Sequence, residues 1–164
     1  TTIIFGLPTE TRKDRYNTVK FVKSLPLSSV RFNTLTPYPG TPVYTQEYPK
    51  GNIHIKGNWE NFGVQYMWEG DDIPYAPEGN DRIELIFDTM WANLACYLSF
   101  RGIKNLLTQK YAGGNVIKLK NKWYLSFSEF KKVSSLFLYL TFRFTNVTIK
   151  MLSGMFIKQF IKKA

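Results

Sequence analysis

Two short segments end a strand-like run with glycine and proline, a pattern typical of a ligand-binding strand terminus. They are TIIFGLP at residues 2–8 and VRFNTLTPYPG at residues 30–40. In parallel sheets and barrels, ligands bind at the carboxyl ends of strands because loops and helix N-termini converge there. Gly6 would allow close backbone approach, and the prolines would pre-shape a loop, which lowers the entropy cost of binding. The alternative is that Gly6 makes only a tight turn and the prolines only stop a strand.

The elements that would position these segments form a β-α-β unit. Residues 2–6 are β-branched and aromatic, and residues 30–35 predict a second strand, which Pro37 must end because proline cannot donate to a ladder. A helix is expected between them at residues 10–24. Such a unit is nearly always a right-handed crossover between parallel strands. The front of the chain is therefore expected to be α/β.

Residues 10–24 are expected to form an amphipathic helix capped by Thr9 or Thr11. Tyr16, Val19 and Val22 recur at three-residue spacing and would face the core. The solvent side would carry the basic residues, namely Arg12, Lys13, Arg15, Lys20 and Lys23.

A short helix is expected at residues 41–48, followed by a long ordered loop at residues 49–80 that is rich in Gly, Asn, Pro and Asp. Within this loop, NIHIK suggests a short strand and NWENF a helical turn. Asp81 would then cap the longest helix, which should run to about Leu107. Its apolar face would contain Ile83, Ile86, Phe87, Met90, Trp91, Leu94, Tyr97 and Leu98.

The C-terminal part of the chain differs from the front in charge. Residues 1–100 carry 9 Lys/Arg against 11 Asp/Glu, whereas residues 101–164 carry 13 Lys/Arg against Glu129 alone. A basic strand-like piece, VIKLKNKWYLSF, precedes a mostly apolar segment from Phe130 to the end. Three interpretations of this tail remain: a helical cap on the domain, a basic helix on an anionic membrane surface, and, least favoured, a nucleic-acid contact.

In the membrane interpretation, apolar side chains would enter the lipid and lysines would lie at the headgroups. The apolar set is Phe156, Ile157, Phe160 and Ile161, and the lysines are Lys158, Lys162 and Lys163. A spanning helix is not expected, because the run SSLFLYLTF is only nine residues long before Arg143.

Cys96 is the sole cysteine, so the chain forms no internal disulfide and supplies too few thiolates for a zinc site or an iron–sulfur cluster. A small buried hydrophobe in a reducing, cytoplasmic protein is the expected role. His54 is not expected to bind a metal, and Glu69, Asp71 and Asp72 are expected to be solvated loop acids. Because Thr1 opens directly on a strand-like run, we expect the sequence to start within a larger protein.

IIFGLPTET at residues 3–11, followed after a helix by VRFNTLTPYPGTPVY at residues 30–44, resembles the second half of the radical S-adenosylmethionine barrel. The similarity is greatest to the branch that includes cobalamin-binding radical enzymes and the anaerobic magnesium-protoporphyrin ester cyclases. There, a strand ending in Gly-Leu-Pro-Gly-Glu-Thr is followed one βα unit later by Thr-Pro-Tyr-Pro-Gly-Thr-Pro-Leu-Tyr. In this chain Thr9 replaces the usual glycine and Val43 the usual leucine. The resemblance covers about residues 1–107.

The resemblance implies α/β architecture: the C-terminal βα units of a partial parallel (β/α) barrel, followed by a mainly helical C-terminal extension. The expected parts are residues 1–48 for the βαβ unit, 49–110 for the loop and long helix that close the barrel, and 111–164 for the basic tail. Residues implied to contact S-adenosylmethionine are Ile4, Gly6, Leu7, Leu35, Thr36 and Pro37. Strand alternation would place Ile4, Gly6, Arg31 and Asn33 toward the barrel interior.

Arg31, Asn33 and Tyr38 are candidates to line the substrate, although an exposed arginine at a strand edge is the simpler explanation of Arg31. Family enzymes bind a [4Fe-4S] cluster through a Cys-x3-Cys-x2-Cys loop, which this chain lacks. The resemblance therefore implies that a missing N-terminal half binds the cluster and that this fragment alone is inactive. Cobalamin would be an optional further cofactor.

Two functional hypotheses follow. The first is the C-terminal part of a radical S-adenosylmethionine enzyme, which shapes the pocket for the cofactor and a small-molecule substrate. The second is a non-enzymatic basic α/β module that binds a membrane surface or a protein partner.

Overall fold

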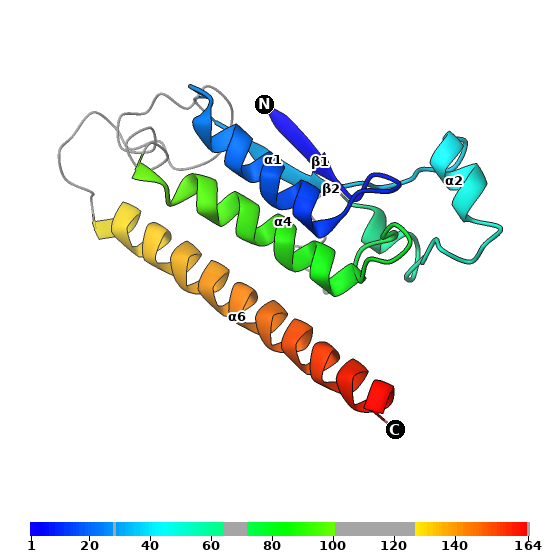
Figure 1. The fold of residues 1–164 in the computed structure, drawn as a ribbon. Helices are drawn as coiled ribbons and strands as arrows, with labels where there is room; N and C mark the ends of the chain where they lie inside the picture. The colour runs from blue at the N-terminus through cyan, green and yellow to red at the C-terminus, as the bar shows by residue number, and fades with distance from the viewer. Residues whose placement is uncertain (28, 64–71, 101–126, 164) are drawn as a thin grey trace.

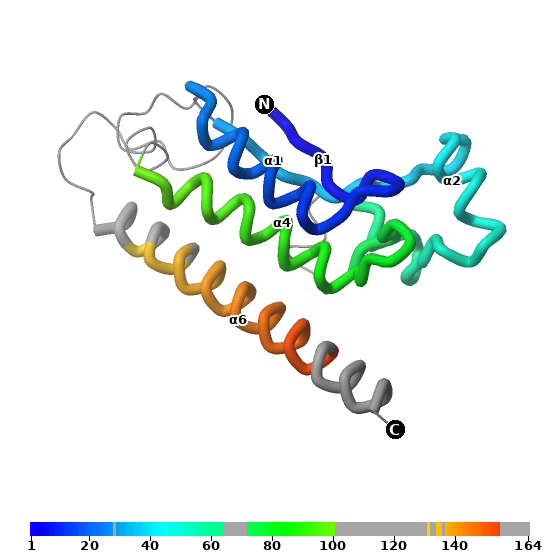
Figure 2. The backbone as a smooth tube through the Cα atoms, in the orientation of Figure 1, coloured from blue at the N-terminus to red at the C-terminus, as the bar shows by residue number. Residues whose placement is uncertain are grey.

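The computed structural model describes residues 1–27, 29–63, 72–100 and 127–163. These residues form two strands and several helices, of which the three longest, at residues 12–24, 82–97 and 127–163, run alongside one another (Figures 1 and 2). In chain order the elements are β1 (Thr2–Phe5), α1 (Arg12–Ser24), β2 (Arg31–Thr34), α2 (Pro42–Glu47), η1 (Glu60–Phe62), α4 (Arg82–Tyr97) and α6 (Phe127–Lys163).

The two strands are parallel neighbours, with Ile3 opposite Phe32 and Phe5 opposite Thr34. This confirms the β-α-β unit that the sequence predicts, with α1 as the crossover. The described residues contain one sheet, of two strands. The remainder of a barrel stays a prediction.

One face of the sheet is covered by α1 and α4, as Figure 1 shows. The rings of Phe5 and Phe32 lie on this face, 5.2 Å apart, and both are fully buried. Val19 and Val22 from α1 and Leu85 from α4 pack against them. Because side chains alternate along a strand, the residues between them point to the other face.

α1 begins where the sequence predicts but buries a residue that was expected to be in solvent. Thr11 is the N-cap, and its side chain and that of Asp14 form a reciprocal capping box. Arg15 was expected to be solvent-facing, and this prediction is wrong, because its side chain is only 1% exposed. Tyr16 was expected in the core but is exposed. The side of α1 that carries Arg15 faces α4, and the carboxylates of Glu84 and Asp88 on α4 pair with the buried guanidinium.

α4 is capped by Asp81, whose side chain accepts from the Ile83 N–H at 2.9 Å, as predicted. It ends at Tyr97, whereas the prediction runs to about Leu107; residues 101–107 of that prediction lie outside the described residues. Leu98 is the C-cap of this helix, and the Ser99 hydroxyl donates to the Cys96 carbonyl at 2.6 Å. Cys96 is buried as expected, and burial raises the pKa of its thiol.

α4 also seals one edge of the sheet through Asn93, which is 4% exposed. Its amide oxygen accepts from the Phe32 N–H at 3.0 Å, and its amide nitrogen donates to the Phe32 carbonyl at 2.8 Å. The Leu35 N–H donates to the Phe5 carbonyl, so the backbone groups of Leu35 point toward β1. Backbone groups of successive strand residues alternate in direction, and those of Phe32, three residues earlier, therefore point away from β1. Asn93 therefore occupies the place of a next strand.

In the described residues of the loop between α2 and α4, side-chain hydrogen bonds rather than a strand hold the chain in place. NIHIK is not a strand in the structure, although the His54 N–H donates to the Pro74 carbonyl at 2.8 Å. The Asn61 side chain bonds two backbone groups of this stretch: its amide oxygen accepts from the Lys56 N–H, and its amide nitrogen donates to the His54 carbonyl. NWENF contains the predicted helical turn, η1. Glu69, Asp71 and the basic piece at residues 116–126 lie outside the described residues.

Residues 127–163 of the predicted tail at 111–164 form α6, which packs on α4 on the side away from α1 (Figure 2). Residues 111–126 of that tail lie outside the described residues. Phe144 stacks on Phe87 with ring centroids 5.3 Å apart, and Val147 and Met151 are buried. Across the described stretches, no helix combines the length and apolar character that crossing a membrane requires.

Candidate functional site

The two predicted strand ends lie next to each other. The Leu35 N–H donates to the Phe5 carbonyl at 2.7 Å, which continues the ladder to the last residue of β1. The loops that begin at Gly6 and Thr36 therefore leave the sheet side by side. This rim is the candidate functional site.

The sheet face opposite the helices carries the strand residues predicted from the resemblance. Ile4 stands opposite Asn33, and Thr2 stands opposite Arg31. Ile4 is 47% exposed, Arg31 is exposed, and Asn33 is partly buried. The structure thus brings an apolar and an amide side chain together on an open face.

The loop residues of the rim differ in how accessible they are. Leu7 and Tyr38 are exposed, Leu35 and Thr36 are partly buried, and Pro37 is buried. The Tyr38 hydroxyl donates to the Phe62 carbonyl at 3.0 Å, which ties the loop to η1. Leu35 packs beside a small second core of Ile53, Phe62 and Tyr75. The proline-rich loop is thus anchored on its inner side.

Gly6 has a packing reason for being glycine. Its φ is +87°, in the region that side chains rarely adopt, and a Cβ there would lie 2.9 Å from Leu85 Cδ2. The missing side chain therefore faces α4 rather than the open sheet face. A role of Gly6 in cofactor contact would have to come from its backbone.

Glu10 completes the turn after β1 and was not singled out from the sequence. Its carboxylate accepts from the Gly6 N–H at 2.5 Å and lies 3.9 Å from Arg15 Nη1. Burial raises the pKa of this carboxyl, although the Gly6 N–H and the Arg15 charge oppose the rise. Only its position four residues after the glycine could have indicated this contact.

Thr9 occupies the position where the resembling family has glycine, and its φ is +68°. A β-branched residue in the left-handed region is strained by about 1 kcal/mol. We expect Thr9→Gly to raise the free energy of unfolding by about that amount in urea denaturation. Thr18→Gly, the same change inside α1, should instead lower it by about 0.3 kcal/mol, the difference between the helix propensities of threonine and glycine. A destabilised Thr9→Gly variant would contradict this explanation.

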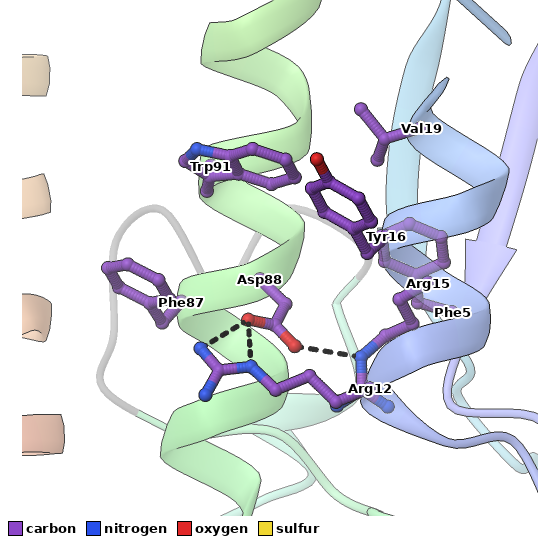
Figure 3. A pocket seen from close by; sticks show the side chains of 8 residues that line it. All are labelled: Phe5, Arg12, Arg15, Tyr16, Val19, Phe87, Asp88 and Trp91. Carbon is purple, nitrogen blue, oxygen red and sulfur yellow. Dashed lines mark hydrogen bonds and ion pairs between the residues drawn. The ribbon is translucent and has the colours of Figure 1, made fainter. Parts of the chain in front are cut away.

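Arg12 and Arg15 of α1 form an ion network with the N-terminal half of α4. Asp88 accepts from Arg15 Nε at 2.9 Å and from Arg12 Nη2 at 3.0 Å, as Figure 3 shows. Glu84 accepts from Arg15 Nη2 at 3.2 Å, and Asn80 accepts from Arg15 Nη1 at 2.9 Å. The network clamps α1 to α4 directly behind the rim.

A pocket of about 180 Å³ opens beside this network, between α1 and α4 (Figure 3). Tyr16 and Trp91, two of its lining residues, stack with ring centroids 6.0 Å apart. The charged side chains of its lining, Arg12, Arg15 and Asp88, are already paired with one another. We interpret it as a gap between packed helices.

No cluster of three or more potential metal ligands occurs in the part of the chain that the structure describes. His54 Nε2 lies 3.0 Å from Asp72 Oδ2, and Arg82 Nε lies 3.4 Å from Asp72 Oδ1. Asp72 is therefore an ion-pair partner rather than a solvated acid, which corrects that prediction.

Over 60 residues, the chain is 38% identical to an uncharacterized methyltransferase of Pyrococcus horikoshii. The match covers 36% of this chain and 13% of that relative. No protein-family model matches the sequence, and no solved structure gives a significant match.

Proposed function

We propose that this chain is the C-terminal part of a radical S-adenosylmethionine enzyme that transfers methyl groups, and that its open sheet face forms one wall of the cofactor and substrate pocket. The observation that carries the proposal is the rim itself: two parallel strands end side by side with the motifs of that family. Partial identity with a protein described as a methyltransferase supports the same enzyme class.

The hydrogen-bonding groups at the two edges of the sheet are consistent with the last part of a barrel, in which β2 is the final strand and β1 pairs with an earlier one. Asn93 takes up the backbone N–H and carbonyl of Phe32 on the outer edge of β2, which favours β2 as the last strand of the sheet. The backbone groups of Thr2 and Ile4 point away from β2, because those of Phe5 point toward it. A preceding strand from an N-terminal half would pair along this edge of β1.

The open face fits an adenosyl group in its chemistry. Ile4 and Leu35 provide apolar surface for the faces of a purine, and the Asn33 amide offers a donor and an acceptor for its edge. When bound, S-adenosylmethionine would supply the transferable methyl group or the adenosyl radical. This chain's residues would bind and orient the cofactor and exclude water from it.

The residues present do not fit an iron–sulfur cluster, since the chain has one cysteine and that thiol is buried in α4. We therefore propose that the N-terminal half of the full-length enzyme would hold the cluster. Use of cobalamin is part of the same proposal and rests on the resemblance alone. The coding sequence upstream of Thr1 is expected to encode a Cys-x3-Cys-x2-Cys loop, and its absence would remove the radical mechanism.

The binding wall is tested by Ile4→Asp in the full-length protein. A carboxylate on the open face would be desolvated by an adenosyl group, so the dissociation constant for S-adenosylmethionine should rise at least about tenfold in titration calorimetry. Gly6→Val is a poor test, because its side chain would strike Leu85 instead of the cofactor.

Ile149→Asp on α6 is the matched control, because Ile149 is exposed to a similar extent as Ile4 but lies on a different surface. It should leave the affinity for S-adenosylmethionine unchanged. Both variants should keep the wild-type circular dichroism spectrum. Equal affinity in Ile4→Asp and wild type would show that the open face is not the cofactor wall.

A further inference from the structure

We propose that the outward face of α6 docks the protein in the plane of an anionic lipid membrane. The surface is called here the outer stripe, and it consists of Leu138, Phe142, Thr145, Ile149 and Leu152. The proposal does not depend on the function proposed for the strand-end rim.

The outer stripe, apolar except for Thr145, is exposed and lies on the side of α6 opposite α4. Its members are separated by four, three, four and three residues, which keeps them on one side of a helix. At about 100° per residue, Leu138 lies about 180° around α6 from the buried Val147. Leu138 is 68% exposed and Phe142 is 64% exposed. α4 thus covers one side of α6 and leaves this one open (Figure 1).

The charge of α6 identifies the chemistry of its partner. Its 37 residues include seven Lys/Arg and only Glu129 as an acid. A second copy of the same helix would bring like charges together, which is unfavourable. A nucleic acid would meet an apolar stripe rather than a basic one. An anionic lipid surface satisfies both features, since its headgroups attract the lysines and its acyl boundary accepts the apolar side chains.

The positions of the charges favour a helix that lies on the membrane rather than one that crosses it. Arg143 and Lys150 interrupt the apolar sequence within α6. At 1.5 Å per residue, the helix is about 55 Å long, so it presents an extended contact line parallel to the surface.

The test is co-sedimentation of the full-length protein with vesicles of phosphatidylcholine alone or mixed with phosphatidylglycerol. Binding is expected only to the anionic vesicles and should weaken as salt is raised, because screening shortens the range of the charges. Phe142→Ser should lower the partition coefficient about tenfold, because the free energy gained by moving the phenylalanine side chain from water into the lipid is lost. Phe21→Ser on α1 is the matched control, because Phe21 is 63% exposed, and it should bind like wild type.

A second pair of variants separates charge from apolar contact. Lys131→Gln combined with Lys150→Gln should reduce binding to anionic vesicles by about fivefold for each lysine removed. Lys13→Gln combined with Lys20→Gln on α1 should have little effect. No binding by the wild type, equal binding to neutral vesicles, or equal loss in Phe142→Ser and Phe21→Ser would each overturn the proposal. A change of oligomeric state in Phe142→Ser without a change in vesicle binding would also overturn it, in favour of a protein partner.

Discussion

Arg15→Met is expected to lower the free energy of unfolding by about 3–5 kcal/mol, because it leaves buried carboxylates without their cation. The Arg15 side chain is 1% exposed, and its Nε lies 2.9 Å from Asp88 Oδ2. Methionine keeps most of the length of the side chain, so the loss reports on the charge more than on packing. Urea denaturation followed by circular dichroism measures it.

Arg12→Met provides the matched control because Arg12 contacts the same carboxylate from a half-exposed position. Its side chain is 46% exposed, and water screens an exposed ion pair, so a loss of about 1 kcal/mol or less is expected. Similar losses in the two variants would mean that burial does not set the strength of this network. A neutral Arg15→Met would mean that α1 and α4 are held by their apolar contacts alone.

Asn93→Leu is expected to lower the free energy of unfolding by about 3 kcal/mol. The change leaves the Phe32 N–H and carbonyl buried and unpaired, and each unsatisfied group costs about 1–3 kcal/mol. The Phe32 amide should also exchange its hydrogen faster than in wild type, which hydrogen exchange with mass spectrometry can follow.

Asn17→Leu tests whether the effect belongs to the position rather than to the residue type. Asn17 is exposed on α1, so the same substitution should change stability by no more than about 0.5 kcal/mol. If Asn93→Leu were as stable as Asn17→Leu, another group would have to form hydrogen bonds with the Phe32 N–H and carbonyl. In that case Asn93 would not be the feature that ends the sheet.

The strands, the helix starts and the crossover could be predicted because their signals are local. Asp81 caps α4 as the sequence predicts, Thr11 is one of the two cap candidates for α1, and Pro37 follows the end of β2. The alternation along β1 and β2 likewise separated the covered face from the open one. These features depend on periodicity and on hydrogen bonds within a few residues, which a single sequence contains.

The orientation of the helices and the ends of the sheet were decided by tertiary structure. Arg15 is buried because Asp88, 73 residues away, meets it, and Asn93 closes β2 across 61 residues. No local sequence pattern shows that a basic or amide side chain has a hydrogen-bond partner so far along the chain. The polarity of Arg15 alone therefore predicted a solvent-exposed side chain. Likewise, the sequence determined that α6 is basic and apolar, whereas only its packing on α4 determined which apolar residues remain exposed, because covering one side of a helix leaves the other side open.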